Sequence, residues 1–138
     1  MDRPIVGTGI IIFKEGKILL GLRKKKIGHN EWQFAGGKVD LFEDFETTVL
    51  REAKEETNLD VTNVRFVGVT NDIYKDFDRH YITLFFACDY KSGPLFNNEP
   101  EKAQDWTWYD PNNLPQPLFL PVKNLLKQNI DFSQYADK

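Results

Sequence analysis

The sequence is poor in cysteine. Cys88 is the only cysteine among 138 residues, so the chain cannot form an internal disulfide. Proteins without disulfides are typical of reducing compartments, which indicates the cytoplasm. Cys88 closes a mostly apolar run that begins at Ile82, and this position favours a buried packing residue over a catalytic thiol.

The sequence also lacks long apolar runs and an excess of positive charge. Its longest apolar stretches, Ile10 to Phe13 and Leu84 to Cys88, are far shorter than the roughly 20 residues that span a bilayer. No basic segment opens the chain, so we expect neither a signal peptide nor a membrane anchor. A net charge of −3 with 18 Lys and Arg residues gives no global field that favours a nucleic acid polymer, so any polyanion must be recognised locally.

What is present is the composition of one compact domain. Hydrophobic residues make up 41% of the chain and charged residues 28%, as in folded globular proteins. Two domains would leave about 70 residues for each core, a size at which disulfides or metals are usually needed. We therefore expect a single domain over residues 1–138.

Strand and helix signals follow one another along the chain. The segment from about Asp44 to Thr57 has no glycine or proline, which predicts a helix that ends at Asn58 in a left-handed conformation. Short β-rich runs predict strands, two of them joined by a hairpin turn, and we expect the tail from Asp131 to fray. The expected strands are Val6–Phe13, Ile18–Leu22, Trp32–Phe34, Val61–Val69, His80–Tyr90 and Trp106–Tyr109, with a closing helix over Val122–Ile130, so the fold class is α+β.

The acidic side of the central helix carries the chemistry. At about 100° per residue, Glu52, Glu55 and Glu56 share an arc of about 100°. This arc overlaps the face expected to be buried, an arc of about 140° that holds Phe45, Val49, Leu50 and Ala53. A Glu-rich helix seen alone is more often a solubilising surface. A solvated charge run would turn away from the core, however, whereas this acidic arc turns toward its margin.

Three neighbouring carboxylates repel one another, so we expect a positive charge among them. Oxygen ligands without nearby His or Cys favour a hard cation, Mg²⁺ or Mn²⁺, over Zn²⁺. Because Mg²⁺ held by few carboxylates usually keeps waters and binds substrate phosphates, the pattern indicates phosphate-ester or phosphoanhydride chemistry.

The spacing of these residues resembles the signature of the Nudix hydrolases, a 23-residue box of the form GX5EX7REUXEEXGU. Chance agreement at six such positions has a probability on the order of 10⁻⁷ or less per window. Asn58 stands where the pattern has Gly, and Ala53 where it has a larger aliphatic residue; Asn tolerates the same positive φ as Gly. The matching residues are Gly37, Glu43, Arg51, Glu52, Glu55 and Glu56.

The resemblance extends over about Val6 to Lys127 and implies the Nudix fold, an α/β/α sandwich with a mixed β-sheet between helices. The segments DRHYITLFF from Asp78 and NEPEKAQDWTWYD from Asn98 are most similar to the MutT-like nucleoside triphosphate branch. The ADP-ribose branch usually carries a proline about 15 residues beyond the box, and its absence here weighs against that branch.

The resemblance also implies roles for the box residues. Glu52 and Glu56 would be metal ligands, Glu55 a further ligand or the base that deprotonates water, and the Gly37 carbonyl another ligand. Arg51 and Glu43 would form the ion pair that fixes the loop to the helix. A separate loop would add one carboxylate, for which Glu101 is the candidate and Glu99 the rival.

Substrate contacts are expected upstream and downstream of the box. Arg23 heads a basic cluster and suits a bidentate phosphate contact. The Asn by which the MutT mutator enzyme recognises oxidised guanine has no clear counterpart around Leu118 to Pro121. By family likeness, the other expected substrate-binding residues are Gln33, Gly36, Lys38, Thr83 and Phe119.

The expected function is Mg²⁺-dependent hydrolysis of a phosphoanhydride bond in a nucleoside triphosphate, giving a monophosphate and pyrophosphate. The alternatives are a nucleotide-sugar or dinucleotide pyrophosphatase and a non-catalytic nucleotide sensor. The sequence leaves open the nucleobase, attack at the α or β phosphorus, and which glutamate is the base. The expected partner is a small-molecule nucleotide, without a membrane or a nucleic acid polymer, and a homodimer is common among Nudix proteins.

Overall fold

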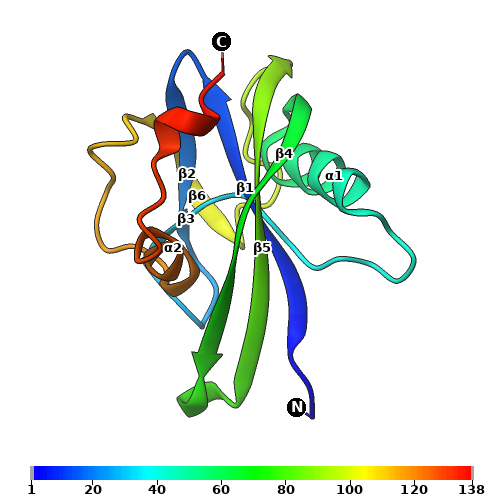
Figure 1. The fold of residues 1–138 in the computed structure, drawn as a ribbon, viewed down its shortest axis with the longest axis vertical. Helices are drawn as coiled ribbons and strands as arrows, with labels where there is room; N and C mark the ends of the chain where they lie inside the picture. The colour runs from blue at the N-terminus through cyan, green and yellow to red at the C-terminus, as the bar shows by residue number, and fades with distance from the viewer. Residues whose placement is uncertain (1, 138) are drawn as a thin grey trace.

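The computed structural model of the chain describes residues 2–137 and contains one six-stranded sheet with a helix on each side (Figure 1). The expected fold class is confirmed. In chain order the elements are β1 (Ile5–Lys14), β2 (Lys17–Arg23), β3 (Trp32–Gln33), α1 (Phe45–Thr57), β4 (Asp60–Tyr74), the 3₁₀ turn η1 (Lys75–Phe77), β5 (Arg79–Ser92), β6 (Ala103–Tyr109), α2 (Leu120–Leu126) and η2 (Phe132–Tyr135).

The sheet is mixed, as expected. Its strand order is β3-β2-β1-β5-β4, and β6 pairs with β2. The β1 and β5 strands run parallel, whereas the other strand pairs are antiparallel. The predicted β1–β2 hairpin is present, and Glu15 and Gly16 make its turn with positive φ angles of 52° and 78°.

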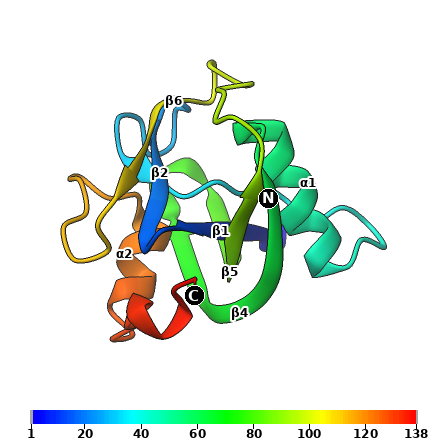
Figure 2. The ribbon, with the colours of Figure 1, turned by 90° about the horizontal axis from the view of Figure 1, so that it is seen from above.

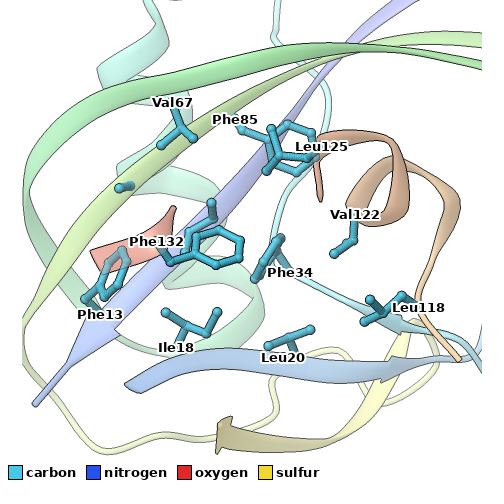
Figure 3. Packing of buried hydrophobic residues seen from close by; sticks show 12 residues of the cluster. Phe13, Ile18, Leu20, Phe34, Val67, Phe85, Leu118, Val122, Leu125 and Phe132 are labelled. Carbon is cyan, nitrogen blue, oxygen red and sulfur yellow. The ribbon is translucent and has the colours of Figure 1, made fainter. Parts of the chain in front are cut away.

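Alternating residues of β1 point into two different cores. Ile10 and Ile12 belong to the cluster beneath α1, whereas Ile11 and Phe13 belong to the cluster beneath α2. This is why the strand reads as a continuous apolar run, because successive side chains of a strand buried on both faces must all be apolar. Figure 2 shows α1 and α2 on opposite sides of the sheet, and Figure 3 shows the α2-side cluster.

The α1 helix has the predicted boundaries because both ends are capped. Asp44 is the N-cap, and its side chain accepts a hydrogen bond from the Thr47 amide at 2.8 Å. Such caps contribute about 0.5–2 kcal/mol. Asn58 ends the helix with φ of 67°, and its amide donates to the Lys54 carbonyl oxygen. Asn therefore replaces Gly at this position without changing the turn.

The expected buried face of α1 is only partly correct. Val49 and Ala53 are fully buried, but Phe45 and Leu50 are 48% and 39% exposed. Phe45 lies in the first turn and packs against Phe86 of β5, and Leu50 lies at the edge of the arc. The buried arc is instead completed by Thr48, Glu56 and Thr57.

The C-terminal segment differs from the prediction. The α2 helix begins two residues earlier than expected because Pro121 suits the first turn, where no amide donor is needed, and it ends at Leu126. Over residues 131–137 the tail is packed and does not fray: Phe132 is 5% exposed within the α2-side core, and the Asp137 carboxylate accepts hydrogen bonds from the Glu15 and Gly16 amides. A buried aromatic residue therefore anchors the tail.

The β4 and β5 strands are longer than expected and form a long antiparallel pair that projects beyond the rest of the sheet (Figure 1). This extension brings Tyr74 and Tyr81 next to α2 and the β2–β3 segment, where they line a cavity. Within residues 2–137, the longest helix has 13 residues, and none is long and apolar enough to cross a membrane.

Candidate active site

Two cavities share a wall and form one cleft at the end of the sheet where β1 and β5 begin. One cavity, of about 160 Å³, has aromatic side chains at its far end, and the other, of about 330 Å³, has carboxylates. We call these the aromatic cavity and the acidic cavity. The residues that line both are Arg23, Lys25, Gln33, Gly36, Gly37 and Lys38.

Glu56 is the most deeply buried acid of the acidic cavity. Its residue exposure is 7%, and its Oε1 accepts a hydrogen bond from the Gly36 amide at 3.0 Å. Burial raises the pKa of the Glu56 carboxyl to about 8, the Gly36 amide opposes this, and the nearby Glu52 and Glu99 carboxylates add to it. A nearby cation would remove this energetic cost of holding the carboxylate ionised.

Glu52 lines the same cavity one turn earlier on α1. Its Oε1 accepts a hydrogen bond from Arg51 Nη1 at 2.7 Å, and burial raises the pKa of its carboxyl. A Cβ added at Gly37 would collide with the Glu52 carboxylate. A side chain at position 37 would therefore push the Glu52 carboxylate out of its place in the acidic cavity.

Arg51 and Glu43 form a bidentate ion pair that ties this loop to α1. Arg51 Nε lies 2.8 Å from Glu43 Oε2, and Nη2 lies 2.8 Å from Oε1. Thr48 Oγ1 also donates to Glu43 Oε1 at 2.6 Å, and Arg51 Nη2 reaches the Lys38 carbonyl oxygen at 3.3 Å. Hydrogen bonds from Arg51 and Thr48 lower the pKa of Glu43 to about 2, and the same pair raises the pKa of Arg51.

Glu55 is separated from the other two helix carboxylates. Its side chain is 50% exposed, and its Oε2 lies 3.4 Å from Arg51 Nη1. Arg51 therefore contacts both Glu55 and Glu52 from outside the cavity. Over residues 2–137, no three His, Cys, Asp or Glu side chains lie close enough together to hold a metal ion. The structure thus brings Glu52 and Glu56 together, but not Glu55.

A separate loop brings Glu99 toward Glu56. Glu99 Oε2 accepts a hydrogen bond from Lys102 Nζ at 3.1 Å, whereas its Oε1 is buried without a hydrogen-bond partner. Its charge is close enough to contribute to the raised pKa of Glu56. Glu101, in contrast, is exposed and is not among the described residues that line either cavity.

The residues present fit a hard divalent cation. Glu52 and Glu56 line the acidic cavity and supply oxygen donors, the kind that Mg²⁺ and Mn²⁺ prefer. The unpartnered Oε1 of Glu99 is a further oxygen donor, although among residues 2–137 it does not complete a cluster of three carboxylates. The Gly37 carbonyl oxygen is already engaged, since it accepts from the Thr8 amide at 2.8 Å and from Thr8 Oγ1 at 3.0 Å. A ligand role for this oxygen requires the Thr8 hydroxyl to turn away, because a carbonyl has two lone pairs.

The aromatic cavity ends in a stack of rings with Arg23 above it. The rings of Phe119 and Tyr74 lie 6.3 Å apart and nearly parallel, and the Arg23 guanidinium lies 4.2 Å from the centre of the Phe119 ring. Arg23 Nη1 donates to Gln33 Oε1 at 2.6 Å, and Nε donates to the Ile27 carbonyl oxygen at 2.5 Å. Burial lowers the pKa of Arg23. Arg23 is thus held rigidly between the two cavities.

The structure places the other expected substrate residues on the same cleft and adds some that the sequence analysis missed. Gly36 and Lys38 line both cavities, and Thr83 lines the aromatic one. Tyr74 and Tyr81 were not expected. A signal was available, because Tyr74 is two residues from Asp72 and Tyr81 is two residues from Thr83, and residues two apart in a strand lie on the same face of the sheet. Lys25 and Lys102 were not expected either, because the sequence does not show which lysines face the cleft.

Comparison with known proteins defines the class to which this fold and site belong. The NUDIX domain model matches residues 3–128, and the chain belongs to this family of hydrolases. Among solved structures it is similar to a MutT NUDIX hydrolase from Burkholderia pseudomallei, with a TM-score of 0.85 and 31% identity over 92% of this chain and 98% of that one. The chain therefore has the Nudix fold and is a pyrophosphohydrolase by family.

Relatives of similar identity carry different names. The chain is 31% identical to an RNA pyrophosphohydrolase of Hydrogenovibrio crunogenus, over 91% of this chain and 79% of the relative. It is 34% identical to an ADP-ribose pyrophosphatase of Methanocaldococcus jannaschii, over 84% of this chain and 68% of the relative. The NUDIX domain of Shewanella oneidensis NrtR, solved with ADP ribose, is similar at a TM-score of 0.71, but its 17% identity indicates the fold alone.

Proposed function

We propose that this protein hydrolyses a phosphoanhydride bond of nucleoside triphosphates, with Mg²⁺, to give a nucleoside monophosphate and pyrophosphate. The observation that carries the proposal is the division of one cleft into an acidic cavity and an aromatic cavity, with basic side chains between them. A nucleoside triphosphate has the complementary order of parts: a flat base, then a sugar, then a chain of negative charges.

At the acidic end, Glu52 and Glu56 would hold the metal ion, and Glu99, after a movement of its side chain, and the Gly37 carbonyl are further candidates. When bound, a divalent cation there offsets the charge of the phosphates and acidifies a bound water. Glu99 takes the place of the expected Glu101 because its free oxygen is buried beside the other acids. Mn²⁺ is a chemically reasonable substitute, since it prefers the same oxygen ligands.

Between the two ends, Lys25, Lys38 and Arg23 would neutralise the phosphate chain. Phe119 and Tyr74 would stack on the base, and Gln33 and Thr83 would contact its edge. Gly36 and Gly37 allow the loop backbone to approach closely, because a side chain at either position would collide with Thr8 or Glu52. This arrangement would direct the phosphate chain of the bound nucleotide toward the acidic cavity.

The chain offers two glutamates to orient and deprotonate the attacking water. Glu52 lines the acidic cavity, and the half-exposed Glu55 lies beside it across Arg51. Both contact Arg51, so Arg51 and Glu43 would keep the helix and the loop in register while the proton is transferred. Attack at the α or β phosphorus gives different labelled products, so product analysis decides between them.

The names of the relatives suggest two alternative substrates for this protein. One relative is named for RNA and another for ADP-ribose, and both match most of this chain. The aromatic cavity of about 160 Å³ favours a single base over a second nucleoside or a polymer chain. A sensor that binds without cleavage is disfavoured because all the acids of the box are present.

The decisive experiment is a substrate panel in Mg²⁺, scored by the identity of the products. The panel contains the nucleoside triphosphates, ADP-ribose, nucleotide sugars, dinucleoside polyphosphates and a 5′-triphosphorylated RNA, with Glu56→Gln as the inactive control. We expect the highest kcat/KM with a nucleoside triphosphate and equal amounts of monophosphate and pyrophosphate. A higher kcat/KM with RNA or ADP-ribose, or binding without turnover, would refute the proposal.

We also propose a cellular compartment and an oligomeric state for this protein. The buried Cys88 and the absence of disulfides suit the cytoplasm. A homodimer is the proposed assembly, and the molar mass measured by light scattering tests it, with a value near 16.1 kDa contradicting it.

A further inference from the structure

A buried carboxylate lies beside the aromatic cavity. Asp72 is on β4 and has an exposed fraction of 0%. Its neighbours on the same face of the sheet are Thr70 on β4 and, across the pair with β5, Tyr81 and Thr83. Tyr81 and Thr83 line the cavity whereas Asp72 does not, so Asp72 reaches the cavity through its hydrogen bond with Thr83.

The Asp72 carboxylate accepts three hydrogen bonds from protein side chains. Its Oδ2 accepts from Thr70 Oγ1 at 3.0 Å and from Thr83 Oγ1 at 2.6 Å. Its Oδ1 accepts from Asn124 Nδ2 at 2.9 Å, and Asn124 reaches it from α2. Three donors around one carboxylate, contributed by three elements, form a network that the proposed chemistry at the acidic end does not use.

This network fixes the polarity of the Thr83 hydroxyl. A carboxylate can only accept hydrogen bonds, so the single hydroxyl proton of Thr83 must point at Asp72. The oxygen of Thr83 is then left with lone pairs and no proton to offer a ligand. Thr83 therefore presents the aromatic cavity with an acceptor, whereas an unconstrained threonine could donate or accept.

The orientation of the Gln33 amide is also fixed by a charged neighbour, which in this case can only donate hydrogen bonds. Arg23 can only donate, and it donates to Gln33 Oε1 at 2.6 Å. The amide group that remains for a ligand is the Nε2 donor. The cleft thus offers a fixed acceptor at Thr83 and a fixed donor at Gln33, each set by a charged neighbour that cannot reverse its role.

We propose that Asp72 is a positioning residue for base selection, and that the protein prefers a nucleobase with an exocyclic amino group. The inference rests on the proposed function. An amino group donates to the Thr83 oxygen, whereas the carbonyl oxygen at the same position of uracil or hypoxanthine would face it lone pair to lone pair. Sites that satisfy a buried hydrogen-bonding group discriminate strongly against ligands that leave it unpaired.

The test compares two matched pairs of substrates, CTP with UTP and ATP with ITP, in which an amino group is replaced by a carbonyl oxygen. We expect the kcat/KM of the amino-bearing member to be at least about tenfold higher in each pair. The variant Asp72→Asn should reduce this ratio to less than about threefold or reverse it. Its amide oxygen would stay with Asn124, so its NH₂ would donate to Thr83 and release the hydroxyl proton toward the base.

Two further variants separate base selection from folding. Thr83→Val removes the acceptor and should also reduce the ratio to less than about threefold, even if Asp72→Asn does not fold. The matched control is Asp89→Asn, which removes a carboxylate of the same strand pair that lies 2.9 Å from Arg65 and lines neither cavity. The control should keep the wild-type ratio, and circular dichroism checks that each variant is folded.

The inference and the proposed function fail differently. If no triphosphate is hydrolysed, the proposed function fails, and calorimetric Kd values for non-hydrolysable CTP and UTP analogues test base selection instead. Equal kcat/KM values, or equal Kd values, for amino-bearing and carbonyl-bearing members would overturn the inference while hydrolysis itself stands. An unchanged ratio in folded Asp72→Asn would remove Asp72 from base selection.

Discussion

The Arg51 guanidinium binds the Glu43 carboxylate through two hydrogen bonds of 2.8 Å each, and this pair joins the loop over the acidic cavity to α1. Arg51 also reaches the Lys38 carbonyl oxygen and Glu52. A planar guanidinium is suited to this geometry because its donors match a carboxylate and still leave others free. The pair therefore sets where Gly37 passes over Glu52.

The first prediction concerns the pH dependence of stability. The folded pKa of Glu43 is about 2, below its ordinary value of 4.5. Its stabilising contribution is therefore fully present above pH 4.5 and is lost as the pH falls through 2. We expect Glu43→Gln to lower the free energy of unfolding at pH 7 and to flatten its decline on acidification, as measured by urea denaturation.

The control for this prediction is Glu46→Gln, an exposed glutamate in the first turn of the same helix. It should change the free energy of unfolding less than Glu43→Gln does at pH 7. An acid limb of the stability curve that is identical in wild type and Glu43→Gln would contradict the assignment.

The second prediction concerns the deepest acid. Glu56→Gln keeps an oxygen that can accept from the Gly36 amide, so we expect it to fold with a melting temperature close to that of wild type. It loses a charge at the proposed metal site, which should lower kcat by at least about a hundredfold. Steady-state kinetics together with thermal unfolding check this, and near-wild-type turnover would remove Glu56 from the metal site.

The third prediction separates two neighbouring loop acids. Glu99→Gln should lower activity and raise the Mg²⁺ concentration needed for half-maximal turnover, because the unpartnered oxygen of Glu99 is buried near Glu56. Glu101→Gln alters an exposed side chain and should change both quantities by less than about twofold. The reverse order of effects would restore Glu101 as the loop ligand.

The fourth prediction concerns Arg23. Lysine cannot reproduce both hydrogen bonds of Arg23 and its stack on Phe119, so Arg23→Lys should raise KM more than it lowers kcat. The matched control is Lys26→Ala, which alters an exposed lysine of the same basic segment and should leave KM unchanged. An unchanged KM in Arg23→Lys would place Arg23 outside the substrate site.

Local signals in the sequence were sufficient for α1, the β1–β2 hairpin and the buried position of Cys88. Caps, turn residues and an apolar run act within a few residues of one another, so their effect is visible without the fold. The C-terminal tail was predicted wrongly because Phe132 is held by residues from β1, β2 and β5, which are distant in sequence.

The amino-acid sequence by itself determined the family, the acidic face of α1 and the residues of the box, because these depend on spacing along one helix and its preceding loop. Only the tertiary structure decided that Glu99 rather than Glu101 approaches Glu56, and that Thr83 donates a hydrogen bond to Asp72. The physical reason is that a hydrogen bond or a buried charge depends on distances of a few ångströms between strands and loops. Those distances are set by packing of the whole sheet, not by neighbours in the chain.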